Sequence, residues 1–111
     1  MAFEKRIGKD GSYLEDLDRN IILKKVIGGP DFAGYELKID DDKFLIQLTV
    51  KTTKEGECWD LHTINFPKNY DPRRKDDITS IAKEAINAAL DLFYKRTRSL
   101  LHLTYSIDQP N

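Results

Sequence analysis

Cys58, Asp60 and His62 are the residues whose types and spacing come closest to a chemical site. They stand at alternate positions, so on a regular strand their side chains share one face, with successive ones about 6.5–7 Å apart. A thiol near an imidazole could act as a nucleophile while the carboxylate orients the ring, and the three groups could also ligate a metal. A direct Cys–His hydrogen bond needs roughly 2.6–3.2 Å, which this spacing exceeds. We therefore expect a solvated strand face and keep a small enzyme built on these three residues as an alternative.

Two further groups suggest a metal, and neither has the composition of a known site. His102 could join His62 if their strands pair, but most strand histidines are surface or core residues with a satisfied hydrogen bond. Asp40, Asp41 and Asp42 are consecutive, so they cannot all turn toward one calcium ion, which takes six to eight oxygens. We expect a solvated hairpin turn there, and neither a metal nor a cofactor in the protein.

Phosphate chemistry has one candidate segment, the loop over residues 67–75. No GxGxxG or GK[ST] motif occurs, since Gly28-Gly29 precedes a proline, so we expect no nucleotide. Basic side chains in the loop could hold phosphates, and an aromatic one could stack on a base. This alternative, a single-stranded nucleic-acid-binding domain, uses Lys68, Tyr70, Arg73, Arg74 and Lys75. The balance of 18 Lys+Arg against 19 Asp+Glu does not favour a nucleic-acid binder.

Alternating apolar residues predict four strands that must position these side chains. The strands cover residues 21–27, 35–39, 44–50 and 58–66, with turns at 28–30, 40–42 and 54–57. Short connections indicate an antiparallel meander. Ser12 and Glu15 have the spacing of a capping box, which predicts a short helix over 12–18.

The last of these four strands changes phase. Trp59 and Leu61 have one parity, whereas Ile64 and Phe66 have the other. A one-residue bulge near residues 62–63 would return all four side chains to the core face.

The C-terminal third predicts one long helix and one more strand. Apolar residues recur at helical spacing from about 77 to 97, with Asp76 or Asp77 as the cap. Alternation over 101–107 predicts a fifth strand that could pair with the same sheet or with a second copy of the chain. The sequence therefore predicts an α+β domain with a short N-terminal helix, a four-stranded antiparallel meander, one long helix packed on the sheet, and a fifth C-terminal strand.

The composition bounds the class of protein. The 111 residues, 40% of them hydrophobic and 33% charged, are enough for one domain over 1–111 with its own core. We expect the ends, 1–11 and 108–111, to fray. A single cysteine excludes an intramolecular disulfide, and no apolar run is long enough for a signal peptide or a membrane span. We expect a cytoplasmic protein that does not bind membranes.

Elimination leaves a non-catalytic interaction domain as the leading hypothesis. Its partner would be another protein or a second copy of the chain, and its role accessory, inhibitory or regulatory. Leu45 and Leu100 stand on otherwise polar parities of their strands, so they could extend an exposed apolar patch. We expect Leu45, Leu100 and Trp59 to contact the partner.

Overall fold

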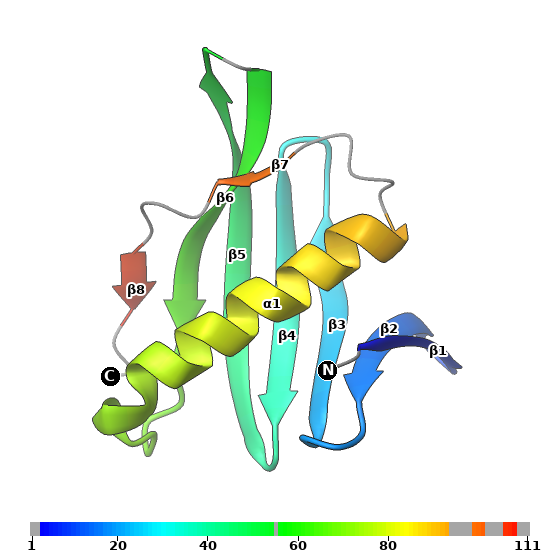
Figure 1. Cartoon of the computed structure of the whole chain (residues 1–111), viewed down its shortest axis with the longest axis vertical. Coiled ribbons are helices and arrows are strands. Elements are labelled where there is room, and N and C mark those ends of the chain that lie inside the picture. The colour runs from blue at the N-terminus through cyan, green and yellow to red at the C-terminus, as the bar shows by residue number, and fades with distance from the viewer. Residues whose placement is uncertain (1–2, 55, 94–98, 102–105, 109–111) are drawn as a thin grey trace.

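The computed structural model describes residues 3–54, 56–93, 99–101 and 106–108. Six strands pair antiparallel, each with the next along the chain, and one helix crosses one face of the sheet they form (Figure 1). The strands are β1 (Glu4–Gly8), β2 (Gly11–Asp16), β3 (Ile21–Gly28), β4 (Phe32–Ile39), β5 (Asp42–Thr53) and β6 (Gly56–Asn65). The helix is α1 (Lys75–Phe93), which follows the 3-10 turn η1 (Pro72–Arg74). The protein is thus an α+β domain, and the prediction of a four-stranded meander is wrong because two more strands precede it.

The predicted N-terminal helix over 12–18 is also wrong, because this segment forms β2. β1, which lies in the segment expected to fray, and β2 make a hairpin in which Gly8 pairs with Gly11. Gly11 has φ +114°, a conformation that glycine adopts without strain. Leu14 of β2 is fully buried, opposite Leu23 of β3. Seven residues cannot sustain an isolated helix, whereas a strand paired on both sides satisfies its backbone groups.

The predicted fifth strand over 101–107 is replaced by two short strands that run parallel to β6. β7 (Ser99–Leu101) pairs with residues 58–60 of β6, and β8 (Ser106–Asp108) pairs with residues 63–65. Residues 102–105 lie outside the described part of the chain. The two short strands cover one edge of the sheet in cis, while β1 forms the other edge.

The predicted bulge in β6 is confirmed. Gln47 of β5 pairs with Thr63, and Leu48 pairs with Leu61, so His62 is the extra residue. The four apolar side chains on either side of it, Trp59, Leu61, Ile64 and Phe66, are all buried in the core. The bulge therefore keeps the apolar residues of β6 on the face that α1 covers.

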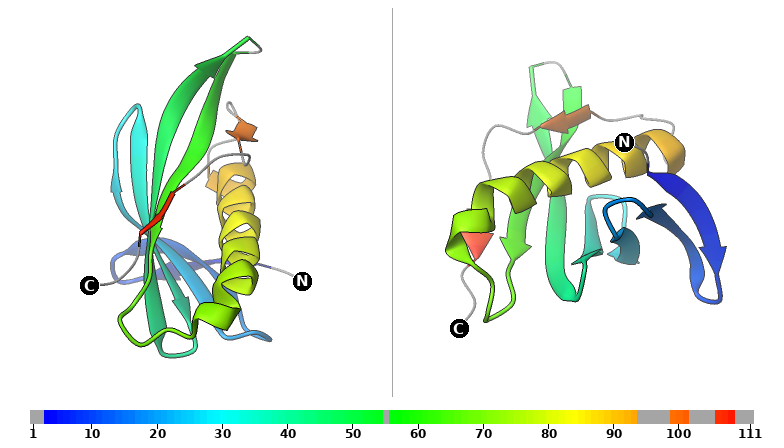
Figure 2. Two further views of the ribbon diagram at one scale, coloured as in Figure 1. Left: turned by 90° about the vertical axis from the view of Figure 1, so that its left-hand side faces the viewer. Right: turned by 60° about the horizontal axis from the view of Figure 1, so that its bottom comes forward.

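Helix α1 lies on the sheet through small residues. Ala82, Ala85 and Ala89 are fully buried, which lets the helix backbone approach the strands closely, and larger side chains flank them. Figure 2 shows the helix on one side of the sheet only. The helix begins at Lys75, two residues before the predicted start, and residues 94–98 lie outside the described part.

The predicted cap is replaced as well. Asp71 caps the preceding 3-10 turn by accepting a hydrogen bond from the Arg73 backbone N–H at 3.0 Å. Asp76 and Asp77 instead occupy the first turn of α1, where negative charge suits the helix dipole.

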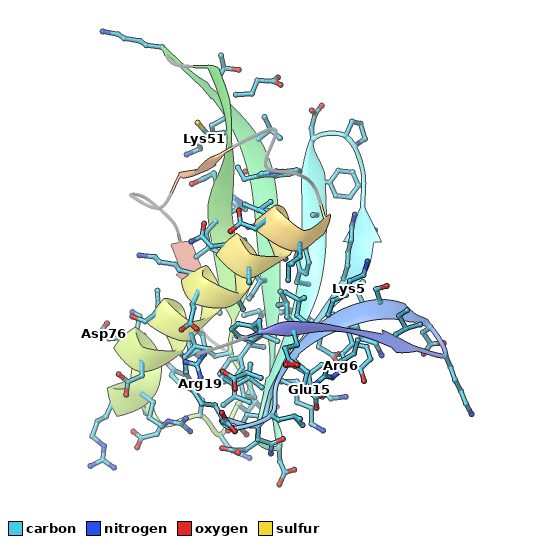
Figure 3. The ribbon with its side chains drawn as sticks, turned by 45° about the vertical axis from the view of Figure 1, so that its right-hand side comes forward. Lys5, Arg6, Glu15, Arg19, Lys51 and Asp76 are labelled. Atoms are coloured by element: carbon cyan, nitrogen blue, oxygen red, sulfur yellow. The ribbon has the colours of Figure 1, made fainter. Side chains whose placement is uncertain are left out.

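Arg19, in the turn between β2 and β3, joins this turn to the helix. Its Nε donates to Asp16 at 2.6 Å, and its two terminal nitrogens donate to Glu84 of α1 at 3.1 and 2.6 Å. The guanidinium also lies over the Phe3 ring, 5.6 Å from its centroid. Figure 3 shows Arg19 between the turn and the helix. One side chain thus fixes the helix to the N-terminal part of the sheet.

Candidate functional site

The face of the sheet away from α1 carries no covering element among the described residues. We call it the outer face. Side chains alternate along each strand, so the residues between the buried positions of β3, β4 and β5 lie on it. In these strands the outer face comprises Ile22, Lys24, Ile27, Phe32, Gly34, Glu36, Lys38, Lys43, Leu45, Gln47, Thr49 and Lys51.

A second bulge, which the sequence did not indicate, places an apolar side chain on this face. Lys25 pairs with Tyr35 and Ile27 pairs with Gly34, so Val26 is the extra residue of β3. In a regular strand Ile27 would share the core face with Leu23. The bulge turns it to the outer face, where it is 58% exposed. Bulges often re-aim side chains at functional sites.

Gly34 allows Ile27 to lie across β4. A Cβ atom added at Gly34 would come within 2.7 Å of Ile27 Cγ2, closer than side-chain atoms approach one another. Any larger residue would therefore push Ile27 away from the sheet.

Beside Ile27 and Gly34 the outer face is hollowed. The hollow has a volume of about 250 Å³ and is lined by Ile27, Phe32, Ala33, Gly34, Gln47, Leu48 and Thr49. Drug-sized ligands occupy pockets of roughly 300–1,000 Å³, so this hollow has the size for one side chain rather than for such a ligand. Phe32, at its rim, is 45% exposed.

The half of the outer face that lies away from the hollow carries three lysines, Lys24, Lys38 and Lys43. Lys38 and Lys43 lie directly opposite each other on β4 and β5, a pairing of like charges that disfavours the sheet. Neither lysine, nor Lys24 on β3, forms an ion pair with any residue that the structure describes. Glu36 is the acidic residue opposite Lys24. Three lysines against one glutamate give this half an excess of positive charge.

The residues expected to contact a partner fall in different places. Leu45 lies on the outer face and is 50% exposed. Trp59 lies in the core and is 6% exposed, so it offers almost no surface to a partner. Leu100, in β7, pairs with Trp59 of β6, and the side chain of Leu100 lies outside the described part of the structure. Of the three, only Leu45 can be assigned to an exposed surface.

The alternating trio on β6 does not form a hydrogen-bonded site. Asp60 is buried and pairs through Oδ2 with Lys51 Nζ at 3.1 Å, and its Oδ1 has no partner among the described residues. His62, the bulge residue, is exposed and forms no hydrogen bond with the described residues. Cys58 lies half-buried, with Sγ 4.0 Å from the Gly56 carbonyl oxygen. The geometry therefore does not assemble the nucleophile, base and orienting group that an enzyme of this kind needs.

No cluster of three metal-ligating side chains occurs within the described ranges. His102, the suggested partner of His62, lies outside them. Asp40 and Asp41 form the β4–β5 turn, and Asp42 begins β5. Asp40 has φ +53° and accepts a hydrogen bond from Asn20 Nδ2 at 3.3 Å.

One cation of the basic loop is paired with an acidic neighbour. Arg73 is paired with Asp71 at 3.1 Å, and this hydrogen-bonded guanidinium lowers the pKa of the Asp71 carboxyl. The Tyr70 ring packs against Phe66 with centroids 4.3 Å apart and the two ring planes tilted by 36°, so one side of the Tyr70 ring is covered. Lys75 begins the helix, and Lys68 and Arg74 are exposed. In the part of the chain described, the loop thus presents two exposed cations outside an ion pair and one aromatic ring that Phe66 covers on one side.

The sequence did not indicate Ile27 and Phe32, which with Leu45 are exposed apolar residues of the outer face. Phe32 follows Gly-Gly-Pro-Asp and lies between the predicted turn at 28–30 and the predicted strand at 35–39, although it begins β4. Ile27 belongs to a run of β-branched residues in which a bulge leaves no mark.

No described helix is long and apolar enough to cross a membrane. No family model, curated protein or solved structure matches the chain.

Proposed function

We propose that this chain is a non-catalytic domain that binds another protein through the outer face of its sheet. One observation carries the proposal: a bulge turns Ile27 out of the core and onto an open sheet face that already exposes Phe32 and Leu45. A residue of this kind gains free energy by burial, so its placement on the surface points to a surface that a partner covers.

The free energy that a partner would gain by burying Ile27, Phe32 and Leu45 suits a reversible contact. Full burial of a large apolar side chain contributes about 1.5–3 kcal/mol. Ile27, Phe32 and Leu45 are 45–58% exposed, so covering what remains exposed would contribute about 1 kcal/mol for each. Polar contacts around the patch would add specificity more than affinity.

The substitution Leu45→Asp is expected to weaken association and to leave the fold intact. Because Leu45 is half-exposed, the free energy of unfolding should fall by less than about 1 kcal/mol. Ile46→Ala, one residue further on the buried face, should lower it by about 2–5 kcal/mol and serves as the matched control. Urea unfolding measures both variants, and equal losses would show that Leu45 belongs to the core.

Site-specific photo-crosslinking in the cells that make the protein tests the function itself. A photoreactive phenylalanine analogue replaces Gln47, which lines the hollow, and in a second variant replaces Ser80, which is exposed on α1. We expect a protein adduct from position 47 that is absent from position 80 and is lost when Leu45→Asp is added. Equal labelling from both positions, no adduct, or an adduct with nucleic acid would contradict the proposal.

A further inference from the structure

The outer face combines two features that a single partner segment could satisfy. At one end lies the apolar hollow beside Gly34, and at the other lie the like-charged Lys38 and Lys43. Lys38 is four residues further along β4 than Gly34, which corresponds to about 13 Å along the strand. Leu45 lies between the two ends, opposite Glu36.

We infer that the outer face takes an extended segment of a partner protein with large apolar, apolar and acidic residues at positions i, i+2 and i+4. This rests on the proposed function and specifies its partner. Alternate side chains of an extended segment point the same way and advance about 6.6–7 Å for each pair of residues. The first would enter the hollow, the second would cover Leu45, and the carboxylate would lie between Lys38 and Lys43.

Charge complementarity identifies the acidic position. Lys38 and Lys43 face each other across β4 and β5 without an acidic partner in the described residues, and Lys24 adds a third positive charge. A carboxylate between the two ammonium groups would relieve their repulsion and make charge-assisted hydrogen bonds. In contrast, Lys51 at the other end is already paired with Asp60.

The same lysines could in principle hold phosphates, but the apolar half of the face favours a polypeptide. Single-stranded nucleic acids bind sheets on which several aromatic rings stack with successive bases. On the outer face of β3 to β5, Phe32 is the only aromatic side chain, and Ile27 and Leu45 are aliphatic. The lining of the hollow is also mainly apolar, which suits an apolar side chain.

A labelled peptide tests the inference on the full chain. The probe is a fluorescein-labelled peptide with Phe, Leu and Glu at positions i, i+2 and i+4 in a serine–glycine background. We expect binding tighter than about 1 mM by fluorescence anisotropy. The peptide with Gln in place of Glu, and a labelled single-stranded oligonucleotide, should bind at least about fivefold more weakly.

Variants of the protein locate the site. Charge reversal of both lysines (Lys38→Glu with Lys43→Glu) should weaken peptide binding by about tenfold or more, and Gly34→Ala should weaken it by narrowing the hollow. Phe32→Ser gives a second test at the rim, should Gly34→Ala disturb the strand. Lys9→Glu, in the distant β1–β2 turn, is the matched control and should leave binding unchanged.

The outcomes separate the inference from the proposed function. Absence of binding at about 1 mM, equal binding of the Gln peptide, or insensitivity to the lysine reversals would overturn the inference. If a protein adduct still forms at position 47 in the crosslinking experiment, the proposed function survives with a partner of different chemistry. Tighter binding of the oligonucleotide, with affinity falling steeply as salt rises, would replace the protein partner by a nucleic acid.

Discussion

Asp16 shows how one side chain can join distant parts of the sequence. It occupies a core-facing position of β2, is only 3% exposed, and is compensated by Arg19 at 2.6 Å. Arg19 in turn reaches Glu84, which is 65 residues away in the chain. The hydrogen bond from Arg19 holds the pKa of Asp16 below its ordinary value, and the two carboxylates raise the pKa of Arg19.

Removing this link should loosen the helix from the N-terminal strands. Arg19→Ala leaves the buried Asp16 without its cation, so we expect a lower urea midpoint than for the wild type. Glu84→Gln should cost less, because Asp16 keeps its partner. Ser80→Ala, exposed on the same helix, is the control. A variant Arg19→Ala with an unchanged midpoint would show that the contact contributes nothing to stability.

The same pair predicts how stability changes with pH. A carboxyl group whose pKa is lowered by folding stabilises the folded protein above its unfolded pKa, and this contribution is lost as the pH falls through the folded pKa. The stability difference between wild type and Asp16→Asn should therefore be largest above about pH 4 and shrink below it. Urea unfolding at a series of pH values measures this, and a difference that grows in acid would have the wrong sign.

The alternation of apolar and polar residues along a strand predicted the environment of some of these side chains and not of others. Leu45 stood out because it interrupts the polar side of an otherwise regular strand, and it is exposed as that pattern indicates. Trp59 was expected at a surface although its parity with Leu61 places it in the core. The contact between Arg19 and Glu84 leaves no local pattern, because both are ordinary surface residue types.

The two bulges have opposite effects on the strands that contain them. The bulge at His62 returns Ile64 to the core side, whereas the bulge at Val26 removes Ile27 from it. The first restores an apolar pattern that is visible in the sequence. The second bulge interrupts an apolar pattern, and it is recognised only from the register between β3 and β4.

Deletion of His62 should be tolerated. Without this residue, Leu61 and Thr63 would be consecutive and would pair with Leu48 and Gln47 in a regular ladder, and Ile64 would still face the core. We expect a loss of less than about 3 kcal/mol in the free energy of unfolding. The emission of the single tryptophan should stay at the short wavelengths of a buried indole.

Deletion of Asp60 is the matched control, because it removes one residue from the regular part of the same strand. It would turn Trp59 to the outer face, and the expected loss is about 3–5 kcal/mol with emission shifted to longer wavelength. If both deletions shift the tryptophan emission by the same amount, the bulge at His62 does not determine which side chains of β6 face the core.

The meander from β3 to β6 was predictable because each strand alternates apolar and polar residues over most of its length. The β1–β2 hairpin was not, since the inward side chains of β2 are Leu14 and the charged Asp16. With one apolar residue facing the core, the capping-box spacing of Ser12 and Glu15 was the stronger local signal. The pairing of β2 with β3 outweighs it, and such a contact between segments cannot be read from a short window.

At the scale of the whole molecule, α1 covers one face of the sheet, and no other described element covers the opposite face. In a symmetric dimer through the outer face whose two-fold axis runs along the strands, the lysine-rich halves of the two copies would meet, which disfavours that arrangement. The opposite edges of the sheet differ as well, since β7 and β8 cover β6 while β1 carries Glu4, Lys5 and Arg6. Charged edge strands resist pairing with other chains.

We therefore expect a monomer in solution, without bound nucleic acid. Size-exclusion chromatography with light scattering should give the mass of one chain, and absorbance at 260 nm should not exceed that of pure protein. Replacing Arg73, Arg74 and Lys75 together by alanine should not change the elution. A stable dimer would contradict this expectation, and a salt-sensitive 260 nm excess lost in the triple variant would restore the basic loop as a nucleic-acid site.

The order of the elements along the chain also bears on how the protein is made. All six antiparallel strands precede α1, and each pairs with its neighbour in sequence, so the sheet can assemble from local contacts while synthesis continues. Until residues 75–93 have emerged from the ribosome, the face that carries Leu37, Ile46 and Leu61 has no cover. The nascent chain then exposes its most apolar surface, and synthesis of the helix ends that period.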